Sequence, residues 1–388
     1  MASGRGGSSE PWRVGVLFSQ SGFSAVIERT QFNGTILAIE EINAAGGIGG
    51  RPIEPVVYDP GSDFISFRRY AEHLLGEEQV NVVFGCYTSG SRKAVLPAIE
   101  RKNALLFYPT LYEGFEYSPN VIYTGAAPNQ NSVQLAQYMM ENHGKRFFLV
   151  GSNYVYPYES NRIMSDLVTE QGGKVVAERY VRLNSEPADF DRIIAEIAET
   201  RPEVIFSTVV GQSTAQFYKA YRAAGFEPET MPIASLTTCE AEVADMGVAA
   251  ARGHVTAAPY FETVDSDANR AFVARYRERF GAGEHTNMCC EAAYFQVYLF
   301  ARALAATNAL DAQSLREALL GIEFQAPQGP VRIDPDNHHT YLWPRIGRID
   351  GNGAFEIVRE ASAWVKPDPY LVTHTLDDWS SAVGQVAI

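Results

Sequence analysis

The chain has 388 residues, of which 46% are hydrophobic and 20% are charged, a composition typical of globular proteins and a length that favours two lobes. Its formal net charge of −14 repels phosphate backbones, so we expect no direct nucleic-acid binding. No apolar stretch approaches the ~18 residues that a membrane-spanning helix needs, and we therefore expect no membrane insertion.

Residues 1–10 are small and polar and contain no apolar segment of the kind that an export signal requires. We expect them to form a flexible tail and the protein to be cytoplasmic; a periplasmic location is the alternative if an export signal has been removed. The cysteines Cys86, Cys239, Cys289 and Cys290 lack the spacing of metal ligands and include an adjacent pair. We expect reduced, partly buried thiols, and neither a metal nor a cofactor.

The first part of the chain alternates strands and helices. Apolar runs predict strands at 12–18 and 53–58, and helical periodicity predicts helices at 28–43 and 67–76. The glycine cluster at 46–50 follows a helix rather than a strand, so it predicts a helix end and a turn rather than a phosphate-binding loop. This alternation with short connections predicts a doubly wound parallel sheet.

The next segment is a strand, a helix and two further strands, predicted at 82–84, 93–102, 104–107 and 120–124. Its first two strands are short, unbroken apolar runs, which are typical of parallel strands buried on both faces. The crossover helix places the carboxyl ends of these strands side by side. Ligands bind at that edge in open α/β sheets, so we expect a binding site there.

Hydroxyl groups follow both of these strands. Tyr87 and Ser89 come after the first strand, and Tyr108 and Thr110 after the second. Ser89 lies just ahead of the predicted helix, where unpaired backbone N–H groups and the helix dipole suit a carbonyl oxygen. The alternative is that Ser89 is only the helix cap and Tyr108 a half-buried core aromatic. The convergence with Thr110 favours a site.

The pattern restarts near residue 128 and predicts a second lobe. Tyr154 and Tyr156 follow one of its strands and Thr237 follows another, so hydroxyl groups again gather at strand ends. Two sheets that face each other with these edges would enclose a cleft. The predicted strands are 146–150, 174–180, 204–207 and 232–234, and the predicted helices are 132–142, 159–171 and 190–200.

The last third of the chain returns to the first lobe. The sequence predicts a strand at 254–261 that returns to the first lobe, followed by helices at 268–280 and 290–307. A further strand pair is expected at 331–333 and 344–349. Three crossings between lobes would form a hinge that permits closure around a ligand.

The predicted fold class is therefore α/β, with two doubly wound parallel-sheet lobes joined by a three-crossover hinge. We assign residues 11–125 and 258–332 to the N-terminal lobe, and residues 126–257 and 333–388 to the C-terminal lobe.

Several sequence motifs resemble a known family. They are GCYTS at 85–89, YPTLYEGFEYSPN at 108–120, APNQN at 127–131, APQGPV at 326–331 and PDPY at 367–370 with LDDW at 376–379. The similarity extends from Val14 to Trp379 and identifies the chain as resembling the short-chain amide and urea branch of the type I periplasmic-binding-protein fold. Within that branch it is most similar to the amide-binding sensors that negatively regulate the aliphatic amidase operon.

This resemblance implies a set of site residues. Urea-transport relatives usually carry Trp at the position of Tyr87 and Val at that of Thr110, whereas this chain keeps the residues of the amide sensors. It departs from the sensors at Thr88, Gly90 and Tyr158, and Thr88 matches the urea transporters. The implied ligand contacts are Ser89, Tyr108, Thr110 and Tyr154, with Tyr87, Tyr156 and Thr237 as lining residues.

The resemblance and the hydroxyl groups together predict non-catalytic binding of a small neutral ligand, because hydroxyls satisfy both the oxygen and the hydrogens of an amide. We expect an acetamide-like aliphatic amide or urea in the interlobe cleft. The implied role is a ligand sensor that controls expression of the amidase operon, with an RNA-binding antitermination regulator as its partner. A homo-oligomer is compatible with the sequence. The alternative is a periplasmic substrate-binding protein of an ABC transporter for urea or short-chain amides.

Catalytic alternatives have weak support. The segment GQSTA at 211–215 lacks the final glycine of a nucleophile elbow, and no base is evident for Cys86. The histidines at 338–339 lie near Asp334 and Asp336 without the loop pattern of a metal site. We expect four glutamates to be surface residues or partners between loops: Glu113, Glu116, Glu240 and Glu242.

Overall fold

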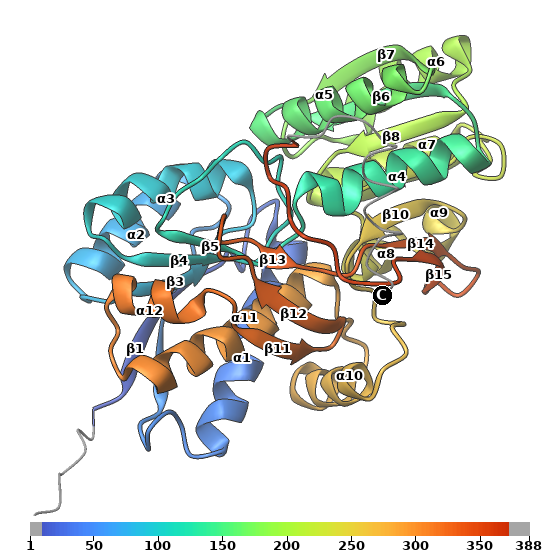
Figure 1. Ribbon diagram of the computed structural model, residues 1–388. Helices are drawn as coiled ribbons and strands as arrows, with labels where there is room; N and C mark the ends of the chain where they lie inside the picture. The colour runs from blue at the N-terminus through green and yellow to red at the C-terminus, as the bar shows by residue number, and fades with distance from the viewer. Residues whose placement is uncertain (1–9, 372–388) are drawn as a thin grey trace, which may run out of the picture.

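The computed structural model describes residues 10–371, which form two lobes around two separate main sheets (Figure 1). The first sheet has the order β2-β1-β3-β4-β5, and all its strands are parallel. Its strands are β1 (Trp12–Leu17), β2 (Ile53–Tyr58), β3 (Val82–Gly85), β4 (Leu105–Tyr108) and β5 (Val121–Tyr123).

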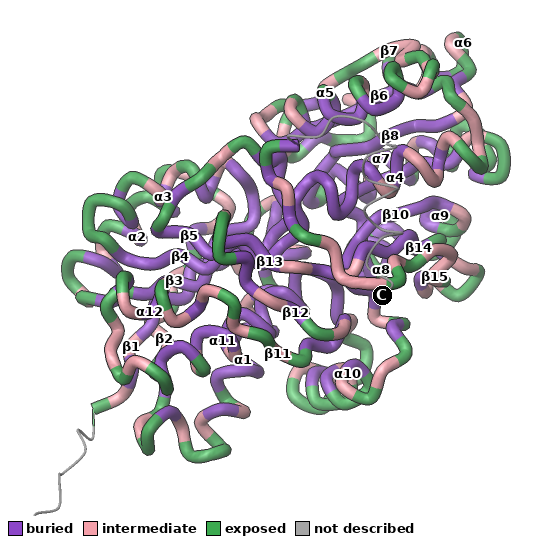
Figure 2. The backbone as a smooth tube through the Cα atoms, in the orientation of Figure 1, coloured by how far each residue is buried: buried purple, intermediate pink, exposed green. Residues whose placement is uncertain are grey.

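Helices cover both faces of this sheet, as the doubly wound prediction requires. One face packs against α1 (Ala25–Ala44) and α11 (Met288–Thr307), and the other against α2 (Phe64–Gly76) and α3 (Ser89–Arg101). Every residue of β3 and β4 is buried, because helices lie on both sides of these apolar strands (Figure 2). The helix predicted at 93–102 begins earlier, at Ser89, which changes the role of that residue.

The second sheet has seven strands in the order β15-β14-β10-β9-β8-β6-β7. Its parallel part is confirmed, but β14 and β15 add an antiparallel edge that the sequence analysis did not predict. Its strands are β6 (Arg146–Ser152), β7 (Lys174–Val181), β8 (Val204–Thr208), β9 (Ile233–Ser235), β10 (Val255–Ala258), β14 (Arg345–Ile349) and β15 (Phe355–Glu360). Its helical segments are α4 (Pro128–Asn142), α5 (Val155–Glu170), the 3-10 helix η1 (Pro187–Phe190), α6 (Asp191–Thr200), α7 (Gln212–Ala223), α8 (Glu240–Met246) and α9 (Val248–Ala251).

A small third sheet, β11-β12-β13, lies beside the first lobe. It consists of β11 (Glu323–Ala326), β12 (Gly329–Ile333) and β13 (Thr340–Tyr341), and it follows helices α10 (Asp267–Phe280) and α12 (Ala312–Leu319). Both strands expected at 331–333 and 344–349 are confirmed as β12 and β14, but their pairing is wrong, because they belong to different sheets.

The chain passes between the lobes three times: after β5, after β10 and between β13 and β14. β10 is a strand of the second sheet, so the return predicted for 254–261 takes place after it rather than through it. The lobe boundaries given above stay a prediction. No helix within residues 10–371 combines the length and apolarity needed to cross a bilayer.

Candidate ligand-binding site

The carboxyl ends of β3 and β4 meet, because these strands are parallel neighbours. Tyr87 and Thr110 lie in the loops that follow these strands, Tyr108 ends β4 and Ser89 begins α3, and at most 4% of each of these residues is exposed. The structure therefore brings four of the predicted site residues to one buried edge of the first lobe.

Ser89 is not the helix cap. The cap of α3 is Thr88, whose extended backbone precedes the helix and whose Oγ1 accepts a hydrogen bond from the Ser91 amide at 3.0 Å. Ser89 is the first helical residue, and its hydroxyl donates to Glu113 Oε2 at 2.5 Å. The capping alternative for Ser89 is therefore wrong.

A buried cation lies behind Ser89. Arg92 has no exposed surface and lies 4.7 Å from the ring centres of both Tyr108 and Tyr112. Its guanidinium donates to Ser89 Oγ at 3.2 Å and to Glu113 Oε1 at 3.3 Å. Glu113 was expected to be either a surface residue or a partner between loops. It is 3% exposed, so it is a partner between loops.

Glu116 completes the pairing of this cation. It accepts from Arg92 Nε at 2.6 Å and from Lys93 Nζ at 2.7 Å. Burial opposes its ionisation, but Arg92 and Lys93 outweigh that effect and lower the pKa of Glu116 to about 2. The positive charge of Arg92 is thus already compensated by two carboxylates.

The second strand end forms its own hydrogen bonds. Tyr108 donates to the carbonyl oxygen of Tyr87 at 2.7 Å. Thr110 Oγ1 accepts from Gln31 Nε2 at 2.9 Å and donates to the Cys86 carbonyl at 3.4 Å. Gln31 was not predicted as a site residue, although its place on the buried face of α1 is a signal that could have found it.

Tyrosines of the second lobe lie opposite. Tyr154 immediately precedes α5 and Tyr156 lies in its first turn, with ring centres 6.2 Å apart. Burial raises the pKa of Tyr154 well above its usual value, and the nearby Tyr156 and Tyr108 raise it further. Tyr154 is half-buried and Tyr156 is buried, and Tyr154 of the second lobe lies near Tyr108 of the first. Thr237 differs, because its hydroxyl has partners within the second lobe: it lies 3.3 Å from Ser235 Oγ and donates to the Val209 carbonyl at 3.5 Å.

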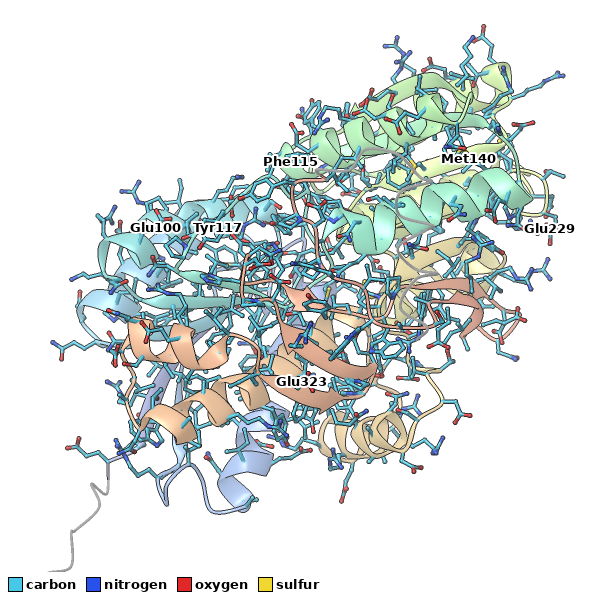
Figure 3. All side chains as sticks on the ribbon, viewed as in Figure 1. Glu100, Phe115, Tyr117, Met140, Glu229 and Glu323 are labelled. Carbon is cyan, nitrogen blue, oxygen red and sulfur yellow. The ribbon has the colours of Figure 1, made fainter. Side chains whose placement is uncertain are left out.

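Direct contacts hold the lobes together around this site. The Gln212 amide donates to the Phe23 carbonyl at 3.0 Å, and α1 packs against α8. Arg162 of α5 lies 5.1 Å from the ring centre of Phe115, which Figure 3 shows at the boundary between the lobes. The two lobes are therefore in direct contact beside this site.

Three buried polar atoms near this boundary have no hydrogen-bond partner of normal geometry among residues 10–371. They come from different elements: Gln31 Oε1 from α1, Tyr156 OH from α5 and Glu242 Oε1 from α8. Such atoms destabilise a protein unless something else satisfies them. Glu242 is 1% exposed rather than a surface residue, and burial raises its pKa to about 8.

The other candidate chemistry of the sequence is buried. Burial raises the pKa of Cys86 far above its usual value, which disfavours a thiolate nucleophile. His339 stacks on Tyr123 at 4.2 Å and its Nε2 lies 2.6 Å from the Tyr112 hydroxyl. The four cysteines are buried and free. Among residues 10–371, no three His, Cys, Asp or Glu side chains are grouped as a metal ion would require.

Comparison with known proteins gives a consistent result. The family described as "Periplasmic binding protein domain" matches residues 12–376. A Leu/Ile/Val-binding protein homolog from Brucella melitensis is 26% identical over 299 residues, which cover 75% of this chain and 76% of that protein.

Two solved structures share the fold. The solute-binding protein of an ABC transporter from Rhodopseudomonas palustris HaA2, in complex with p-hydroxybenzoic acid, has a TM-score of 0.83 and 23% identity, covering 94% of this chain and 99% of that chain. The branched-chain amino acid binding protein LivJ from Streptococcus pneumoniae, in complex with isoleucine, has a TM-score of 0.78 and 20% identity, covering 92% of this chain and 100% of that chain.

Proposed function

The chain belongs to the periplasmic binding protein family, and from this premise we propose that it captures a small neutral amide or urea between its lobes as the substrate-binding protein of an ABC transporter. The observation that supports this most is the buried cluster of hydroxyl groups at the ends of β3 and β4, opposite the tyrosines of α5. Hydroxyls can pair with both the oxygen and the hydrogens of an amide.

The charges at the site favour a neutral ligand. The relatives described above bind a benzoate and an amino acid, and both of these ligands carry a carboxylate. In this chain the buried cation beside Ser89 is Arg92, and it is already paired with Glu113 and Glu116. A buried carboxylate ligand would find no free positive charge there, which is unfavourable.

The aromatic rings favour a small ligand. Tyr87, Tyr108 and Tyr156 are buried and Tyr154 is half-buried, so four large rings gather at the strand ends and at the start of α5. Acetamide and urea have about four heavy atoms, and at ~1.5 kcal/mol per atom their affinity is limited to about 6 kcal/mol, or tens of micromolar.

A second role, the amide sensor, uses the same cleft. It is favoured by Tyr87 and Thr110, which match the amide sensors rather than the urea transporters in the resemblance described above. A sensor would pass the signal to an RNA-binding antitermination regulator. For that, the ligand must bind one lobe arrangement more tightly than the other, since equal affinity would shift nothing.

Calorimetric titration tests the ligand class. We expect acetamide, propionamide or urea to bind with dissociation constants of about 10–100 μM, and leucine and p-hydroxybenzoate not to bind. Binding of either of the latter two alone would contradict the proposed ligand. Cell fractionation then separates the roles, because the transport receptor requires a periplasmic location and the sensor a cytoplasmic one.

A further inference from the structure

Three hydroxyl groups of the site already donate their hydrogen atoms to other oxygen atoms of the protein. A hydroxyl group carries one hydrogen and two lone pairs, so a group that donates within the protein can only accept from a ligand. Each of the three donates to a fixed acceptor of the first lobe: Ser89 to Glu113 Oε2 at 2.5 Å, Tyr108 to the Tyr87 carbonyl at 2.7 Å, and Thr110 to the Cys86 carbonyl at 3.4 Å.

A fourth acceptor lies beside Thr110. The side-chain nitrogen of Gln31 donates to Thr110 Oγ1 at 2.9 Å and to the Pro109 carbonyl at 3.2 Å. The carbonyl of Pro109 accepts only, so this contact fixes which end of the Gln31 amide is the nitrogen. Gln31 Oε1 therefore remains a buried acceptor without a partner.

Glu113 holds Ser89 in this state. It accepts the Ser89 hydrogen with one oxygen, while its other oxygen accepts from Arg92 Nη2 at 3.3 Å. Arg92 also donates to Ser89 Oγ at 3.2 Å, which leaves Ser89 a single lone pair for any further contact. Glu113 is thus a positioning residue, which acts on a ligand through Ser89.

We propose that the first-lobe side of the cleft, here called the wall, presents only hydrogen-bond acceptors to a ligand, and that Glu113 makes Ser89 an acceptor by taking its hydrogen. The site therefore selects ligands with N–H groups over carboxylates of the same shape. This inference rests on the proposed function and specifies the chemistry that the cleft recognises. The N–H groups of the ligand face Ser89, Tyr108 and Thr110. Its carbonyl oxygen faces the second lobe, where the Tyr156 hydroxyl makes no hydrogen bond of normal geometry within residues 10–371 and has Ser160 as its neighbour.

This orientation reverses the expectation from the sequence, which placed a carbonyl oxygen beside Ser89. The reason is that Glu113, far from Ser89 in sequence, takes the Ser89 hydrogen. A carboxylate at the same place would bring its oxygen lone pairs next to the lone pairs of the wall, with no hydrogen atom between them. A site that hydrogen-bonds the N–H groups of one ligand strongly rejects an analogue that lacks those groups.

Acetamide and acetate provide the test, because they share the same shape and heavy-atom count and differ only in an NH2 group and an oxygen. For the wild-type protein we expect calorimetry to give at least about a 100-fold preference for acetamide. In Glu113→Gln, the carbonyl of the new amide faces Arg92 and its NH2 donates to Ser89, so the Ser89 hydrogen turns towards the ligand. The preference should then fall by about tenfold or more.

Glu116→Gln is the matched control. It removes the same charge from the same Arg92 but does not touch Ser89. We expect its preference for acetamide to stay within about twofold of the wild-type value, since the polarity of the wall is unchanged. An equal change in both variants would mean that charge alone decides, and the inference would be overturned.

Tyr108→Phe serves if Glu113→Gln does not fold. It keeps the ring over Arg92 and removes one acceptor, so acetamide should bind about tenfold more weakly while acetate should bind no more weakly than before. Tyr112→Phe is its control, because Tyr112 lies at the same 4.7 Å from Arg92, and it should leave the preference unchanged.

The outcomes separate the two proposals. If the wild type binds acetamide but Glu113→Gln keeps the full preference, the proposed function stands and this inference falls. If the wild type binds an ammonium ligand such as leucine but no neutral amide, the proposed ligand falls while the acceptor wall stands. Preference for acetate, or binding of none of these compounds, would overturn both.

Discussion

The hydroxyl of Tyr156 provides a prediction in which stability and binding change in opposite directions. The residue is 3% exposed, and within residues 10–371 its OH has no hydrogen-bond partner at normal geometry, so in this arrangement of the lobes its burial is opposed only by the nearby Ser160 hydroxyl. A buried unsatisfied polar group costs ~1–3 kcal/mol. Tyr156→Phe removes the group and should therefore stabilise the free protein by about 1 kcal/mol, which raises the melting temperature by roughly 2 °C.

The same substitution should weaken acetamide binding. If the Tyr156 hydroxyl donates to the ligand, its loss removes a net ~1–1.5 kcal/mol, or about tenfold in affinity. Thermal unfolding by calorimetry measures the stability, and titration calorimetry measures the affinity. Urea is unsuitable as the denaturant, because it is itself a candidate ligand.

Tyr221→Phe is the control. Tyr221 is also a buried tyrosine of the second lobe, but its hydroxyl donates to the Met231 carbonyl at 2.8 Å. Its removal should destabilise the protein by about 1 kcal/mol and leave acetamide binding unchanged. A Tyr156→Phe protein that is less stable than the wild type, or that binds acetamide as tightly, would refute the reasoning.

Three further substitutions test the surroundings of the site. Arg92→Met leaves the buried Glu113 without its cation and removes one of the two cations that pair with Glu116. It should lower the unfolding free energy by ~3–5 kcal/mol in thermal unfolding, whereas Lys93→Met, at a half-exposed ion pair, should lower it by less than about 1 kcal/mol. Ser89→Ala should weaken acetamide binding about tenfold in titration calorimetry, and unchanged affinity would remove Ser89 from the site. Burial raises the pKa of Glu28 to about 8, against hydrogen bonds from two serines that lower it. The stability that comes from the neutral form of Glu28 is complete below about pH 4.5 and is lost as the pH rises through about 8. Glu28→Gln should therefore reduce the fall in melting temperature between pH 5 and pH 8. Glu54→Gln, at the surface, should not change that fall.

The fold of the first lobe was predictable because its signal is local. The runs that form β3 and β4 are short, apolar and separated by a helical segment, a pattern that few other arrangements share. The convergence of Tyr87 and Tyr108 followed from the direction of parallel strands alone. By contrast, α7, α8 and α12 were not predicted. In α7 the buried residues are mainly aromatic, Phe217, Tyr218 and Tyr221, and they do not give a clear apolar stripe.

The internal chemistry of the site was less accessible. Whether Thr88 or Ser89 caps α3 depends on backbone angles, since either residue type can cap a helix. The contact between Ser89 and Glu113 joins two loops, and nothing in the local pattern distinguishes Glu113 from a surface glutamate. The sequence could therefore place hydroxyl groups at the cleft but not the direction of their hydrogen bonds.

The most direct test of the central claim is a crystal structure of the protein grown with a saturating concentration of acetamide. The account predicts one acetamide molecule between the lobes, within hydrogen-bond distance of Ser89 and Thr110 on one side and of Tyr156 on the other. A cleft without acetamide, or acetamide bound only elsewhere on the protein, would contradict it.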